Sequence, residues 1–71
     1  MAKVIKAHIT GTVWKIEVKA GESVGEGTVV AILESMKMEM PVESEDDGVV
    51  ETIHVKEGQP VNEGDPIVTL A

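Results

Sequence analysis

The sequence predicts an all-β domain built from an internal repeat. Its 71 residues include 12 valines, 6 isoleucines and 5 threonines, against only 2 leucines. Branched side chains at this density pack well on pleated sheets and poorly in helices. The chain also repeats itself at a fixed offset and carries two glycine-bounded turns. Because its length suits one small domain, we expect residues 1–71 to form a single unit.

The repeat becomes visible when Gly11–Glu34 is laid over Gly48–Ala71, an offset of 37 residues. Ten of the 24 positions are identical, where roughly two are expected by chance in such a composition. The same offset divides the chain into the halves Met1–Glu34 and Met38–Ala71, joined by Ser35-Met36-Lys37. If a pseudo-twofold axis relates the halves, the joint and the chain ends lie on opposite sides of the domain.

Short runs of branched apolar residues, bounded by turn residues, predict the strands. In chain order they are Val4–Ile9, Val13–Val18, Val29–Leu33, Met38–Glu43, Val49–Val55 and Ile67–Leu70. Pro41 and Pro66 cannot donate to a ladder, so we expect them at strand ends or on edge strands. The acidic segment 43–48 is expected to form a charged turn.

Each half also carries the pattern G-x-x-V-x-x-G, once at Gly21–Gly27 and once at Gly58–Gly64. Glycine supplies the positive φ that tight turns require, so each pattern predicts a compact turn around one buried valine. The glycines expected to shape turns are Gly11, Gly21, Gly27, Gly48, Gly58 and Gly64.

The charge and composition exclude several classes of function. Six lysines and no arginine oppose 13 carboxylates, for a net charge of −7. This charge repels phosphate backbones and anionic membrane surfaces, so we expect neither nucleic-acid nor membrane partners. Trp14 is the sole aromatic residue and is expected in the core or packed at an edge. No cysteine is present, and neither a signal peptide nor a transmembrane run is recognisable, so we expect a cytoplasmic protein.

The joint between the halves allows two interpretations. In the first, Met36, Met38 and Met40 point inward from an ordinary strand, while Lys37 and Glu39 face water. In the second, Met-Lys occupies a chain reversal, although Asn-Gly or Asp-Gly is usual there. Methionine at an exposed tip suits adaptable contact with a partner, and lysine is a common target of covalent modification.

With the repeat on both sides, Met36-Lys37-Met38 resembles the signature of a biotinyl/lipoyl attachment domain. The resemblance covers essentially the whole chain and is nearest to free-standing biotin/lipoyl attachment proteins of the biotin carboxyl carrier type. It implies a flattened barrel-sandwich hybrid of two four-stranded antiparallel sheets. It departs from many carboxylase domains at residues 8–11, where only Gly11 remains of a Pro-Met-x-Gly stretch.

The resemblance also implies a function without catalysis: carrying covalent biotin on Lys37. A biotin protein ligase would attach the biotin, reading Glu34, Met36, Met38 and Glu39. The carrier would then shuttle a carboxyl group between biotin carboxylase and carboxyltransferase sites, as a monomer when isolated.

Two other functions stay open. Lipoyl domains usually have Asp-Lys-Ala where this chain has Met-Lys-Met, which favours biotin, but lipoate attachment for acyl or redox transfer remains an alternative. An unmodified β-sandwich interaction module is the third possibility. His8 and His54 are not equivalent in the repeat and have no third ligand at useful spacing, so we expect no metal site. Lys19 and Lys56 are repeat mates and are expected to be solvated turn lysines.

Overall fold

The fold is described here by a computed structural model covering residues 3–71, and this range contains eight strands and no helix. The strands are β1 (Lys3–Lys6), β2 (Gly11–Ile16), β3 (Ser23–Val24), β4 (Val29–Ser35), β5 (Met38–Glu43), β6 (Gly48–Ile53), β7 (Pro60–Val61) and β8 (Pro66–Leu70).

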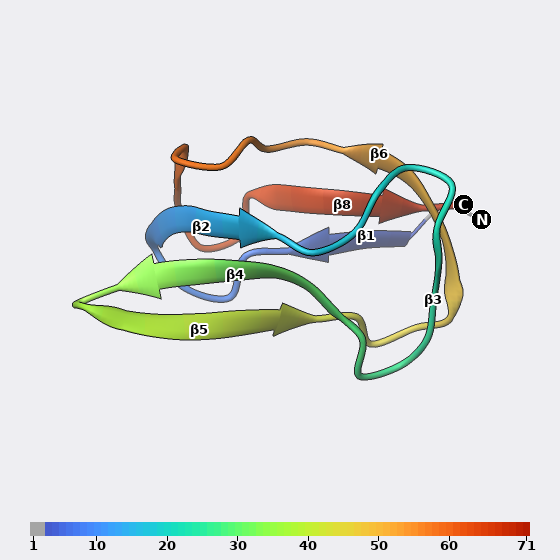
Figure 1. The fold of residues 1–71 in the computed structure, drawn as a ribbon, viewed down its shortest axis with the longest axis horizontal. Helices are drawn as coiled ribbons and strands as arrows, with labels where there is room; N and C mark the ends of the chain where they lie inside the picture. The colour runs from blue at the N-terminus through green and yellow to red at the C-terminus, as the bar shows by residue number, and fades with distance from the viewer. Residues whose placement is uncertain (1–2) are drawn as a thin grey trace.

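The strands form two four-stranded antiparallel sheets, ordered β1-β8-β6-β3 and β5-β4-β2-β7. The offset of 37 residues carries each strand of the first half onto one of the second, β1 onto β5 and so on to β4 onto β8. Under this operation the first sheet becomes the second. The pseudo-twofold symmetry and the predicted fold class are therefore confirmed (Figure 1).

The predicted and observed strand bounds agree best for strands joined to a neighbour in the same sheet. β5 spans Met38–Glu43 as predicted, and Pro41 lies within it on the edge of its sheet. Pro66 opens β8. β1 ends at Lys6, short of the predicted Ile9, because the chain bends over residues 8–10 to cross to the other sheet.

The registers contain matching bulges in the two halves. Along β2 and β4 the pairing passes from Val13 with Leu33 to Lys15 with Ile32, which leaves Trp14 as an extra residue. The equivalent extra residue on β6 is Glu51. Val13 faces the core, so alternation along the strand turns Trp14 outward. The bulge places two consecutive residues of β2 opposite one of β4, so Lys15 also faces outward and Ile16 returns to the core side. Trp14 is 48% exposed, so the expectation of a core position was wrong.

The two G-x-x-V-x-x-G segments form tight turns, as predicted. Their outer glycines all have positive φ, and each turn places one valine in the core, Val24 or Val61. The turns are more ordered than expected, since each includes a two-residue strand, β3 or β7. Gly11 and Gly48 were also expected in turns, but they begin β2 and β6.

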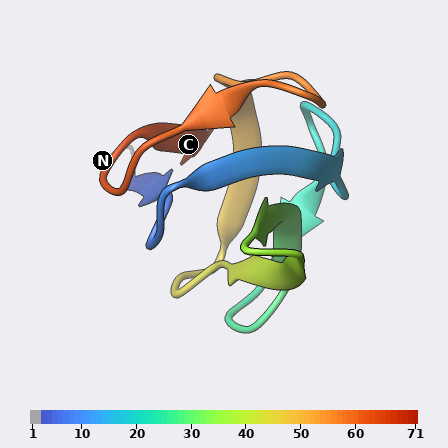
Figure 2. The same cartoon turned by 90° about the vertical axis from the view of Figure 1, so that its left-hand side faces the viewer.

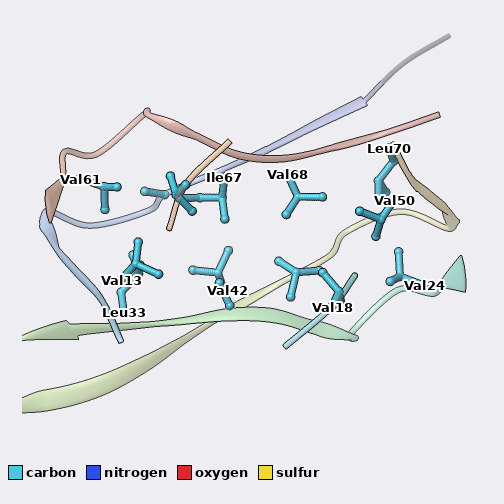
Figure 3. Close-up of a cluster of buried hydrophobic side chains, with 14 residues drawn as sticks. Val13, Val18, Val24, Leu33, Val42, Val50, Val61, Ile67, Val68 and Leu70 are labelled. Carbon is cyan, nitrogen blue, oxygen red and sulfur yellow. The ribbon is translucent and has the colours of Figure 1, made fainter. Parts of the chain in front are cut away.

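The core lies between the sheets and is as symmetric as the sequence (Figure 3). Twelve of its fourteen apolar residues form six repeat pairs. Within these pairs, leucine is equivalent to leucine, and each valine is equivalent to valine, isoleucine or alanine. The pairs are Val13/Val50, Val18/Val55, Val24/Val61, Val30/Ile67, Ala31/Val68 and Leu33/Leu70.

The molecule is elongated, with Cα extents of 33 × 18 × 18 Å. The β4–β5 hairpin projects at one end of the long axis, while the C-terminus and the beginning of β1 lie at the other (Figure 1). Figure 2 looks along this axis from the hairpin end and shows the sheets wrapped around the interior. The arrangement confirms that the joint between the halves lies opposite the two ends of the described chain, residues 3 and 71.

Candidate functional site

The apex of the β4–β5 hairpin is a two-residue turn in left-handed backbone. Ser35 pairs with Met38, and the residues between them, Met36 and Lys37, have φ of 54° and 65°. Two successive positive φ values are the mark of a type I′ turn, which normally uses Asn-Gly. Left-handed backbone costs a residue with a Cβ about 1–2 kcal/mol. These strained residues make the apex a candidate functional site.

The side chains at the apex face solvent. Met36 is 92% exposed and Met38 is 61% exposed, while Met40 is half-buried. Lys37 is exposed and forms no ion pair within residues 3–71. The interpretation of an ordinary strand with Met36 and Met38 turned inward was therefore wrong, and Met-Lys occupies a chain reversal.

Two carboxylates lie just behind the apex. Glu34 on β4 pairs directly with Glu39 on β5, and both are exposed. Like charges opposite each other on a sheet repel, so this pair does not serve the stability of the hairpin. We call residues Glu34–Glu39 the hairpin tip. It brings together all five residues that the sequence assigned to attachment and recognition.

The other lysines of the described chain lie in different surroundings. Lys3 pairs with Asp46 at 3.3 Å, and Lys15 pairs with Glu17 at 3.6 Å. Lys19 and Lys56 lie just before the glycine turns, where their backbone N–H groups donate to the side chains of Glu22 and Gln59. Lys37 alone lies at the apex of the projecting hairpin.

A groove on the surface of the described residues lies away from the hairpin tip. It has a volume of about 630 Å³ and runs between β1 and residues 41–46, and no residue of the hairpin tip lines it. His8 lines this groove, whereas His54 Nε2 lies 2.6 Å from Thr69 Oγ1. Within residues 3–71 no three histidine or carboxylate side chains are grouped to hold a metal ion. The same range has no helix that is long and apolar enough to cross a membrane.

The arrangement at the tip suits covalent attachment rather than catalysis. A primary amine on a flexible stem stands clear of the domain, where an enzyme can enclose it. Deprotonated, the Lys37 amine is a nucleophile toward activated carboxyl groups. The residues present therefore fit a cofactor held through an amide. The sequence did not predict the left-handed backbone at Met36 and Lys37, since neither residue is glycine or asparagine.

Comparison with known proteins agrees with this chemistry. Residues 1–70 match the family described as "Biotin-requiring enzyme". The chain is 45% identical over 67 residues to the biotin/lipoyl attachment protein of Bacillus subtilis, covering 94% of this chain and 92% of that protein. It is 41% identical over 70 residues to the biotin carboxyl carrier protein of Streptococcus mutans, covering 99% of this chain and 54% of that protein.

A solved structure supports the same relationship. The urea carboxylase of Kluyveromyces lactis matches with a TM-score of 0.94 and 34% identity. The match covers 100% of this chain but only 6% of the carboxylase. The chain is thus similar to one small part of a much longer enzyme.

Proposed function

Since the chain belongs to the biotin/lipoyl attachment family, we propose that it is a biotin carboxyl carrier modified at Lys37. It is a non-catalytic carrier of covalent biotin, and components of a biotin-dependent carboxylase are its partners. One observation supports the choice of lysine: Met36-Lys37-Met38 forms the exposed apex of the hairpin at the midpoint of the repeat.

Attachment is an acyl transfer to the Lys37 amine. In the active site of a biotin protein ligase, deprotonated Nζ attacks the acyl carbon of biotinyl-adenylate. The new C–N bond forms the amide, and the C–O bond to the phosphate breaks, so AMP leaves with the electron pair. A base of the ligase takes the proton released by the amine. The carrier contributes access, because the apex stands beyond both sheets.

The domain then anchors the cofactor, and the Lys37 side chain with the valeryl chain acts as the tether. Lys37 would hold biotin through an amide, and the bound ureido ring would supply the atom that carries a carboxyl group between a biotin carboxylase site and a carboxyltransferase site. The Lys37 side chain and the valeryl chain together reach about 14 Å. Tethering replaces diffusion of a free cofactor with a high effective concentration at both sites. We propose that the isolated domain is a monomer, since its net charge of −7 opposes self-association.

Lipoate is the second candidate cofactor. The Bacillus subtilis relative is named for both biotin and lipoyl attachment, and the amide chemistry at Lys37 would be the same. Lipoate attachment would keep the site and move the function to acyl or redox transfer.

The test is intact mass after co-expression with a biotin ligase, a lipoyl ligase and both acids, followed by peptide mapping. A biotinyl increment on the peptide containing Lys37 is expected. Lys37→Arg keeps the charge but cannot form this amide, so it should remove the increment entirely. A lipoyl increment alone would assign the second function. Biotin on Lys19 or Lys56 in the Lys37→Arg variant would overturn the site.

A further inference from the structure

The outer face of the hairpin sheet carries an exposed apolar row. Ile32 pairs with Lys15 on one side and with Pro41 on the other, and Trp14 is the bulged neighbour of Lys15. Trp14 and Pro41 are exposed. Ile32 is half-buried but does not join the core, unlike Ile16 on β2. We call Trp14, Ile32 and Pro41 the outer patch.

The fold itself does not require this row to be apolar. The offset of 37 residues carries Trp14, Ile32 and Pro41 onto Glu51, Thr69 and Val4 of the other sheet. That sheet has the same strand order and the same bulge, yet two of its three equivalent residues are polar. The inner faces of the two sheets carry similar residues at equivalent positions, whereas the outer faces carry different ones. The outer patch is therefore a property of the sheet that bears Lys37.

The patch also lies close to the reactive amine. Along β4, Ile32 is five residues before Lys37, which at about 3.3 Å per residue is about 17 Å. The carboxylates of Glu34 and Glu39 lie between the patch and the apex. A protein that encloses Lys37 and extends along this face therefore meets the acidic pair first and then the apolar row.

We propose that the outer patch docks the biotin protein ligase. This inference rests on the proposed function. The ligase must reach the unmodified amine, so it has to contact protein close to Lys37, whereas the completed arm can reach a carboxylase site from farther away. A standard specific interface buries about 800 Å² on each partner, and a two-residue turn offers only a small part of that area. Trp14, with its large rigid ring, is the expected anchor.

Charge defines the chemistry of the docking surface on the ligase. Glu34 and Glu39 beside the patch, on a chain of net charge −7, call for an apolar surface bordered by lysine or arginine. The same charge disfavours a second copy of this chain as the occupant.

The test is the steady-state kinetics of biotinylation, with a purified biotin protein ligase, biotin and ATP, and the full chain as varied substrate. Trp14→Thr is expected to raise KM about tenfold with kcat unchanged, because it removes binding without touching the reacting groups. Ile32→Thr, which installs the residue of the other sheet, should raise KM less. Val49→Thr is the matched control, because Val49 is an apolar residue of the other sheet and 42% exposed. Its KM should equal that of the wild type.

The outcomes separate the two proposals. A wild-type chain that is not biotinylated would overturn both. If the wild type is biotinylated but Trp14→Thr and Val49→Thr have the same KM, the docking proposal alone is overturned. A fall in kcat at unchanged KM would also overturn it. A wild-type dimer that Trp14→Thr dissociates in sedimentation would assign the patch to self-association instead. Thermal melts should give similar Tm values for all variants, since the three side chains lie outside the core.

Discussion

At the scale of single residues, the apex of the hairpin has a backbone conformation that lowers stability but leaves the side chains of Met36 and Lys37 accessible. Met36 and Lys37 both adopt left-handed backbone, which is costly for residues with a Cβ. A two-residue turn of this kind is nevertheless the shortest way to reverse the chain. It places Lys37 at the apex of the projecting hairpin and leaves Met36 almost fully exposed. The strain at this turn is consistent with a tip shaped for recognition by another protein.

This interpretation predicts a gain of stability when the turn is idealised. Replacing Met36-Lys37 by Asn-Gly should raise the free energy of unfolding by about 1–2 kcal/mol, because both residues tolerate positive φ. Urea denaturation followed by circular dichroism measures the change. Lys37→Arg is the control, since it should leave stability unchanged while still abolishing attachment. A stability unaltered by Asn-Gly would show that the turn is not strained.

At the scale of elements, β4 runs close to β2 next to the hairpin tip. A Cβ built on Gly11 would lie 2.5 Å from the carbonyl oxygen of Glu34. At the equivalent Gly48, the oxygen of Ala71 would be 3.4 Å away and the nearest atom, Leu70 Cβ, 3.2 Å away. Gly11 therefore does more than begin a strand, because it lets β4 run close to β2 just before the tip.

The two glycines should therefore respond differently to alanine. Gly11→Ala forces a backbone oxygen to move and should cost about 2–3 kcal/mol of stability, as overpacking typically does. Gly48→Ala meets a gentler contact and should cost less than about 1.5 kcal/mol, the lower part of the same range. Chemical denaturation of both variants gives the comparison. Equal costs would mean that the approach at Gly11 is no closer than that at Gly48.

At the scale of the whole molecule, the pseudo-twofold axis divides the core into equivalent halves. Leu33 and Leu70 are the two leucines of the sequence. They are repeat mates, each fully buried, on the equivalent strands β4 and β8. Because the sheets contribute matching rows to one core (Figure 3), neither half has a core that is complete without the other.

Because the two halves of the core are equivalent, equivalent substitutions in them should lower the free energy of unfolding by similar amounts. Leu33→Ala and Leu70→Ala should each lower the free energy of unfolding by about 3 kcal/mol, within the range for buried leucines. The two losses should agree to within about 1 kcal/mol, and the double variant should not fold, because small domains have little stability to lose. Denaturation monitored by circular dichroism provides the values. A loss confined to one leucine would show that one half carries the core.

The sequence alone determined those features of the fold that depend on the repeat or on residues close together in the chain. The repeat required equivalent strands, so it predicted the sheet symmetry and the position of Lys37 opposite the chain ends. The glycines of the G-x-x-V-x-x-G turns were predictable because positive φ selects glycine. Residues 38–43 were recognisable as a strand because alternation and flanking turns depend only on near neighbours.

Only the tertiary structure decided which side chains of the strands face solvent. Trp14 was expected in the core or at an edge, and it faces solvent because its neighbour Val13 is the residue of β2 that packs in the core. Met36 and Lys37 took left-handed backbone because pairing of β4 with β5 leaves two residues to reverse the chain. Both outcomes depend on register between strands, which is set by packing across the core rather than by local propensity.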